Sequence, residues 1–302
     1  ELPGELRAGT AAAGRLTTIL IPGRRAIVTL SRGGEALLEP VPAKLTQGAA
    51  LHVEIVREGL AEQGRTKLPK GRATDCPERE GPPLRERLAA SGREVTMVPA
   101  VGADALEDAG WSELIEEAIG GEIAFSGGGL RMSLTPAMTL FDVDGALDVV
   151  ALAVAGAEAA GRAIRRFGIG GSIGIDLPTL ASKEDRQRAA AALDAVLPQP
   201  FERTAVNGFG FLQVVRKRER ASLPELLQAD RVGAAARALL RRAERSGGPG
   251  GRLLHAAPPV IARIEANPEW LDALSARAGG TIALRAEPGL AISAGHVHTP
   301  SI

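Results

Sequence analysis

A strand–helix–strand pattern in the middle of the chain constrains the fold more than any other feature of the sequence. Apolar runs at residues 138–143 and 172–176 predict two strands, and the Ala-rich stretch at 146–167 predicts a long helix between them. Two strands joined by a crossover helix form a parallel pair in one sheet. The sequence therefore predicts an α/β sheet that contains at least one parallel pair.

Short strands and further helices flank this unit. Four short apolar segments separated by turns predict a small β-barrel near the start of the chain; they lie at residues 17–21, 26–30, 35–38 and 51–56. Helices are expected at 182–197, beginning after Ser182, and at 223–245. The predicted fold class is an α/β (α+β) multi-domain protein with this division: barrel 9–70, linker and reduced connecting region 71–110, α/β core 111–222, helix and flexible joint 223–251, and small C-terminal α/β domain 252–302.

The composition excludes several classes of protein. The single cysteine, Cys76, cannot form an internal disulfide or a zinc site built on a Cys pair. The most apolar run, at 149–157, is shorter than the roughly 20 residues of a membrane-spanning helix, so no membrane segment is expected. These features and the absence of a recognisable leader pattern favour a cytoplasmic protein.

Charge is distributed unevenly although the formal net charge is zero. Residues 100–160 carry eleven acids and one base, Arg131, whereas residues 201–252 carry eleven bases and five acids. A uniformly basic nucleic-acid coat is excluded, but a local basic patch is not. Because the chain has only 6 Phe, 2 Trp and no Tyr, it offers little surface on which bases could stack.

Two aspartates end the predicted parallel strands. Asp142 lies near the end of the first strand and Asp176 at the end of the second, so neighbouring strands would bring the two carboxylates to about 5 Å from each other. Such a pair suits Mg²⁺, with Mn²⁺ as an alternative, and Asp144 would orient water or add an oxygen ligand. The alternative is purely structural: Asp142 and Asp144 form an Asx turn with Gly145, and Asp176 ends a strand.

Three segments resemble the nuclease core of the ribonuclease E/G family. They are LTPAMTLFDVDG (134–145), AGRAIRRFGIGGSIGIDLPTL (160–180) and RTAVNGFGFLQVVRKR (203–218). Residues 14–68 are similar to the embedded S1 RNA-binding barrel of that family, and the C-terminal tail is similar to its small C-terminal domain. The resemblance implies an S1/OB-like barrel, a DNase I-like/RNase H-like α/β nuclease core and a small C-terminal domain.

The resemblance also implies an activity. In the family, the aspartates that match Asp142 and Asp176 hold Mg²⁺, and an Asn stands at the place of Asp144. The implied function is Mg²⁺-dependent endonucleolytic cleavage of single-stranded RNA by a metal-activated water, leaving a 5′-phosphate and a 3′-hydroxyl, in RNA processing or decay. The alternative is a catalytically silent RNA-binding protein that acts in rRNA processing or ribosome assembly.

The chain departs from the family at several positions. The stacking aromatics of the S1 barrel correspond to Ile27 and Leu37, and a family Lys corresponds to Gln63. The Cys pair of the zinc link is replaced by the glycine-rich joint at 246–251, so neither a structural zinc nor a zinc-linked dimer is expected. The connecting region at 76–112 is too short for the 5′-end sensor of the family.

Positive charge is therefore expected to hold the RNA. Arg216, Lys217 and Arg218 lie on or just after the strand that follows the core unit. We predict that Arg216 and Arg218, on one face of this strand, contact phosphates beside the metal. The alternative is a solvated strand edge that its charges protect from aggregation. A weaker candidate patch lies on the predicted helix at 223–245 and comprises Arg237, Arg241 and Arg242.

Overall fold

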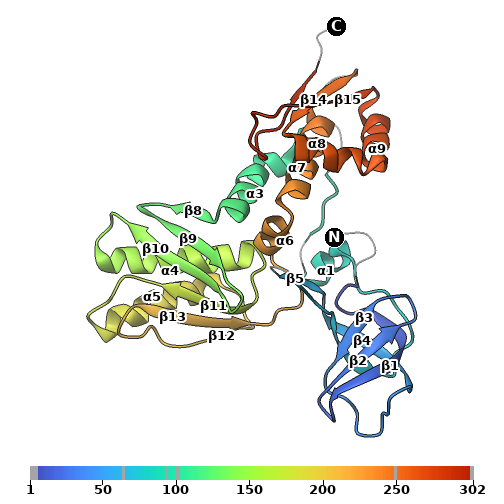
Figure 1. Ribbon diagram of the computed structural model, residues 1–302. Helices are drawn as coiled ribbons and strands as arrows, with labels where there is room; N and C mark the ends of the chain where they lie inside the picture. Colours follow the sequence, from blue (N-terminus) through green and yellow to red (C-terminus); the bar gives the residue numbers. More distant parts are fainter. Residues whose placement is uncertain (1–5, 63–64, 93, 99–102, 248–249, 300–302) are drawn as a thin grey trace. The chain divides into compact units, whose positions relative to one another are not determined.

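The computed structural model describes residues 6–62, 65–92, 94–98, 103–247 and 250–299 (Figure 1). The chain divides into two compact units, one formed by Glu1–Val95 with Gly120–Leu226 and the other by Thr96–Ile119 with Leu227–Ile302. Gln63 and the middle of the glycine-rich joint lie outside the described residues. Within the described part, no helix has the length and apolar character needed to cross a bilayer.

A closed five-stranded barrel forms the N-terminal part of the first unit. The strands follow one another around the barrel in the order β1 (Ala11–Ile21), β2 (Arg25–Leu30), β3 (Glu35–Leu38), β7 (Lys70–Thr74) and β4 (Ala50–Arg57), and β4 pairs with β1. Alternate apolar residues fill its interior, among them Leu16, Val28, Leu38 and Val53. A two-stranded ribbon of β5 (Leu60–Glu62) and β6 (Arg65–Lys67) precedes β7, and helix α1 (Leu84–Ala90) follows it.

The structure confirms the predicted barrel and corrects the point at which the linker starts. The range 71–110 begins inside β7, whose polar sequence KGRAT gives no apolar strand signal. This strand is fixed by two neighbours, because it pairs with β3 on one side and with β4 on the other. A side chain is excluded at Gly71, where a Cβ would lie 2.2 Å from Cγ1 of Val53.

A six-stranded sheet forms the rest of the first unit. Its order is β12 (Glu202–Arg203), β13 (Phe211–Arg216), β11 (Gly171–Asp176), β10 (Thr139–Gly145), β9 (Gly128–Leu134) and β8 (Glu122–Phe125). The pair β10–β11 is parallel and is connected by α4 (Val149–Arg166), which confirms the strand–helix–strand prediction. Helix α5 (Lys183–Val196) begins after Ser182 as predicted, and the Ser182 hydroxyl accepts a hydrogen bond from the backbone N–H of Asp185.

Helices α4 and α5 cover one face of this sheet (Figure 1). Phe141, Ile173 and Ile175 point toward the helices and are fully buried. Small residues on α4 permit the close packing: a Cβ at Gly156 would lie 2.4 Å from Cγ1 of Val143. The residues that alternate with these apolar positions are left on the opposite face of the sheet.

The second unit has a core of its own. Helix α7 (Arg231–Arg245) packs with α8 (Pro258–Glu265) and α9 (Pro268–Ala278) beside a sheet of order β15 (Ile282–Ala286), β14 (Arg252–Ala256) and β16 (His296–His298). The predicted single helix at 223–245 is wrong: α6 (Leu223–Ala229) ends before Asp230. The Asp230 carboxylate accepts a hydrogen bond from the N–H of Gly233 and thereby begins α7 as a new helix.

Helices α2 (Ala105–Asp108) and α3 (Trp111–Gly120) also belong in large part to this unit. The predicted core started at residue 111, whereas the structure groups Thr96–Ile119 with the C-terminal residues. Two contacts explain the difference. The Gln228 side chain donates to the carbonyl of Ala118 at 3.0 Å, and the guanidinium of Arg241 lies 5.1 Å from the ring centroid of Trp111.

Candidate active site

A row of mostly charged residues crosses the uncovered face of the six-stranded sheet. Strand register places five residues side by side in this row: Glu122, Arg131, Asp142, Asp176 and Phe211. The first four are exposed and Phe211 is half-buried, whereas their sequence neighbours Ile123, Met132, Phe141 and Ile175 are buried. The row therefore presents its side chains away from α4 and α5.

Asp142 and Asp176 are direct neighbours at the end of the parallel pair. They are Cα partners in the β10–β11 register, and neighbouring strands lie about 4.8 Å apart. Strand β10 continues to Gly145 with β9 as its partner, so the Asx-turn alternative for Asp142 and Asp144 is wrong. Two carboxylates on adjacent strands repel each other unless a cation or a proton lies between them. We refer to Asp142 and Asp176 as the Asp pair.

The Asp pair has the donor chemistry of a magnesium site. Mg²⁺ prefers carboxylate oxygens and typically takes only one or two of them from a protein, keeping water as its other ligands. Among the described residues, no three or more His, Cys, Asp or Glu side chains are grouped so that they could hold a metal ion together. Asp144 is exposed on the same face two residues beyond Asp142, which suits a contact through water better than direct ligation.

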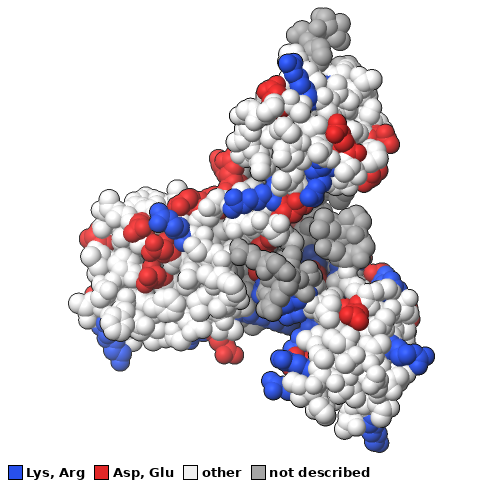
Figure 2. All heavy atoms as spheres, in the orientation of Figure 1, with Lys and Arg blue, Asp and Glu red and all other residues white. Residues whose placement is uncertain are grey.

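Arg131 is a residue of this site that sequence reasoning missed. It lies directly opposite Asp142 in the β9–β10 register and forms an ion pair of 3.2 Å with Glu122. The hydrogen bond to Glu122 raises the pKa of Arg131 above its ordinary value, and the charges of Asp142 and Asp144 raise it further. Its position as the single base of the acidic block was the available signal. Figure 2 shows acidic side chains gathered beside a basic one over the region of β8–β10.

The basic segment, comprising Arg216, Lys217 and Arg218, lies at the opposite end of β11. Strand β13 runs antiparallel to β11, so Arg216 pairs with Gly171, five residues and about 16 Å along the strand from Asp176. The prediction that these bases lie beside the metal site is therefore wrong. Strand β12 pairs with Val214 and Val215 only, so Arg216 has a strand partner on the β11 side alone.

Each member of the basic segment has a partner within the protein. Arg216 is half-buried on the face that the helices cover and donates to the carbonyl of Ile169 at 3.0 Å; burial lowers the pKa of its guanidinium. Lys217 forms an ion pair of 2.7 Å with Glu219, and Arg218 forms one with Glu225. These contacts tie the segment to its own surroundings.

The two barrel positions that the resemblance matches to aromatics are brought together. Ile27 and Leu37 are Cα partners on β2 and β3, and both are half-buried between fully buried neighbours. They form a small aliphatic surface on the barrel. Aliphatic side chains cannot stack on bases as aromatic rings do, so this surface offers only weak apolar contact.

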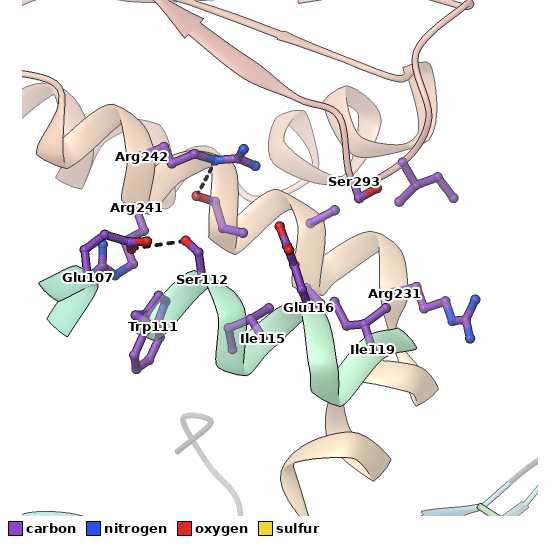
Figure 3. Close-up of a pocket in the computed structure, with 14 residues that line it drawn as sticks. Glu107, Trp111, Ser112, Ile115, Glu116, Ile119, Arg231, Arg241, Arg242 and Ser293 are labelled. Carbon is purple, nitrogen blue, oxygen red and sulfur yellow. Dashed lines mark hydrogen bonds between the residues drawn. The ribbon is translucent and has the colours of Figure 1, made fainter. Parts of the chain in front are cut away.

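A cavity of about 330 Å³ lies within the second unit, lined mainly by α3 and α7 together with Ile292 and Ser293 (Figure 3). Several of its polar groups bond to one another, as Ser112 does to Glu107 at 3.1 Å. Arg241, one of the predicted helix bases, donates to both oxygens of Asp104 at 2.6 and 2.8 Å and lowers the pKa of that carboxyl to about 2. Arg241 is thus part of the packing of this unit.

Neither a scan against known protein families nor a search of curated protein sequences returned a match for this chain. The function is therefore inferred from the Asp pair, from its neighbours in the sheet and from the barrel. Of these, the Asp pair is the most specific chemical feature.

Proposed function

We propose that this protein is a Mg²⁺-dependent endoribonuclease that cleaves single-stranded RNA and leaves a 5′-phosphate and a 3′-hydroxyl. The observation that carries the proposal is the register of β10 and β11, which makes Asp142 and Asp176 neighbours on an exposed sheet face. Open α/β sheets bind ligands at the carboxyl ends of their parallel strands, where this pair lies. In this proposal the six-stranded sheet is a DNase I-like/RNase H-like nuclease core.

The barrel supports nucleic acid as the substrate. Its strand order, with a parallel β3–β7 pair between antiparallel neighbours, is compatible with an OB fold of the S1 type. OB-fold barrels bind oligonucleotides across their strands and loops. With Ile27 and Leu37 in place of aromatics, the barrel would guide the RNA and contribute little stacking energy.

The charges around the Asp pair explain why a cation is needed. Glu122, Asp142, Asp144 and Asp176 share the face with one base, Arg131, so the bare site repels an anionic phosphate. When bound by the Asp pair, Mg²⁺ supplies positive charge and an activated water for phosphodiester hydrolysis. Asp144 is placed to accept a hydrogen bond from a water on this face, and Arg131 is placed to bind a phosphate oxygen.

Cleavage of a 3′-labelled single-stranded RNA with a 5′-hydroxyl end, with and without Mg²⁺, tests the proposal. We expect cleavage that requires Mg²⁺ and is lost in Asp142→Ala, with product ends that a 5′-phosphate-dependent exonuclease degrades. Asp272→Asn, which changes an exposed carboxylate on α9, serves as the matched control and should cleave like the wild type. Equal cleavage by wild type and Asp142→Ala would refute the proposed site. RNA binding without Mg²⁺-dependent cleavage would favour the non-catalytic RNA-binding protein instead.

A further inference from the structure

Phe209 is an aromatic side chain that the protein leaves in water. It is 83% exposed, more than any other large hydrophobic residue among those the structure describes. A ring so exposed gains almost none of the stabilisation that burial of a Phe provides. In a chain with only six Phe and two Trp, this placement requires an explanation other than packing.

The loop that carries Phe209 is held rigidly by hydrogen bonds. The Asn207 side-chain oxygen accepts the backbone N–H groups of Phe209 at 2.9 Å and of Phe211 at 3.0 Å. The Thr179 hydroxyl donates to the carbonyl of Phe209 at 3.3 Å. Gly210 has φ +93°, and a Cβ at this position would lie 2.1 Å from the carbonyl oxygen of Leu177, so only glycine fits.

These contacts fix the loop to the segment that follows Asp176. Phe211 is the register partner of Asp176, and Phe209 lies two residues before it. Since antiparallel partners are about 5 Å apart and two residues span at most about 7 Å, the Cα atoms of Phe209 and Asp176 lie within about 12 Å of each other. Phe209 is therefore within reach of a nucleotide beside the phosphate that the Asp pair would engage.

The open face of the sheet carries apolar side chains as well as the Asp pair. A Cβ at Gly174 would lie 2.6 Å from Cζ of Phe211 and 2.7 Å from Cδ2 of Leu140, so these two side chains cover the glycine. Leu140 lies two residues before Asp142 on the same face. Leu140 and the ring of Phe211 form an apolar patch next to the Asp pair, on the side of the Asp176–Phe211 row that leads away from Phe209.

We propose that Phe209 is a stacking platform for an unpaired nucleobase next to the scissile phosphate. This inference rests on the proposed function and identifies the nucleotide-binding side of that site. An aromatic face accepts any base, because every base has a π-face, so the subsite selects for single strands and is tolerant of sequence. Bases in a duplex are already stacked on their neighbours and would have to be unstacked at a cost of a few kcal/mol each. The preformed loop reduces the ordering entropy lost on binding.

Binding of a fluorescein-labelled single-stranded RNA, measured by anisotropy in the Asp142→Ala background so that the RNA stays intact, tests the platform. We expect Phe209→Ala to weaken binding about 5- to 100-fold and Phe209→Tyr to stay within about 2-fold. Leu226→Ala, which truncates an exposed apolar side chain on α6, is the matched control and should leave binding unchanged. Equal binding by Phe209→Ala and Leu226→Ala would overturn the inference.

Cleavage assays with the otherwise wild-type chain separate this inference from the proposed function. Loss of RNA binding in Phe209→Ala together with no Mg²⁺-dependent cleavage by the wild type would refute the nuclease and retain the stacking subsite. Cleavage by Phe209→Ala with an unchanged KM would refute the subsite and retain the nuclease. If the intact chain binds no single-stranded RNA, both proposals fall. Thermal unfolding of Phe209→Ala should match that of the wild type, since the ring is exposed.

Discussion

Opposite charges lie at the two ends of strand β11, and the fold leaves one set exposed while it pairs the other. At the carboxyl end, Asp176 lies beside Asp142 and both carboxylates are exposed. At the amino end, Arg216 of the basic segment is half-buried and donates to a backbone carbonyl. The acids remain available to a cation, whereas Arg216 and Arg218 are engaged within the fold. Charge that is already paired inside a protein contributes little to binding a ligand.

The comparison shows that density of charge in the sequence is a poor guide to a binding surface. Arg216, Lys217 and Arg218 are consecutive and conspicuous, yet each contacts a group of its own neighbourhood. Asp142 and Asp176 are 34 residues apart and inconspicuous, yet strand pairing makes them adjacent. Availability of a charge depends on the partners that the fold supplies.

The largest expected effect is on the carboxyl end of β11. Asp176→Asn should reduce Mg²⁺-dependent RNA cleavage by at least about 100-fold, since loss of even an outer-shell partner of a metal costs 10- to 100-fold. In EDTA the same variant should unfold at the same or a higher temperature, because it removes repulsion within the Asp pair. Asp272→Asn is again the control. A variant that is destabilised in EDTA and still cleaves RNA would contradict the assignment.

At the opposite end of β11, removal of Arg216 should lower the stability of the protein. Arg216→Ala leaves the Ile169 carbonyl without its donor in a half-buried setting, so we expect the free energy of unfolding to fall by about 1–3 kcal/mol. Affinity for single-stranded RNA should stay within about 2-fold. Urea unfolding and RNA titration measure the two effects. Lys217→Ala, which removes only an exposed ion pair, should cost less than about 1 kcal/mol. If Arg216→Ala weakens RNA binding and leaves stability unchanged, the basic segment is an RNA-binding surface after all.

Arg131 differs from the basic segment because it is a base on the acidic face of the sheet. With Mg²⁺ saturating, Arg131→Ala should weaken RNA binding about 2- to 5-fold, as expected for an exposed charge contact. The slope of log K against log salt should fall by about 0.7, the value for one phosphate contact on a single strand. Titrations of RNA at several salt concentrations measure both quantities. An unchanged slope would show that Arg131 serves only as a counter-ion to Glu122.

The smallest effect concerns Asp104, a carboxylate that is fully paired, unlike the Asp pair. Arg241 lowers its pKa from 3.8 to about 2 in the folded state, so ionised Asp104 stabilises the fold above about pH 4. This contribution is lost as the pH falls from about 4 to 2. The difference in melting temperature between wild type and Asp104→Asn should therefore shrink across this range. Asp108→Asn, an exposed neighbour, should show a smaller and flatter difference.

Local pattern predicted the elements that are defined by their own residues. The two parallel strands, helix α4 and the Ser182 start of α5 follow from periodicity and capping, and the structure confirms them. Strand β7 was not predicted, because its sequence is polar and gives no strand signal. Its pairing with β3 and β4 holds it in the barrel. The break between α6 and α7 at Asp230 was not predicted, because the residues on both sides of it have high helix propensity and favour a single helix.

The Asp pair follows from the amino-acid sequence alone, because two strands joined by a helix pair in parallel and bring their carboxyl ends to one edge. Three other placements emerge with the folded chain: Arg131 faces Asp142, Arg216 lies at the far end of β11, and Phe209 stays exposed. These placements depend on the direction and register of strands that are distant in sequence. Such pairings are selected by the packing of the whole sheet, which local periodicity does not encode.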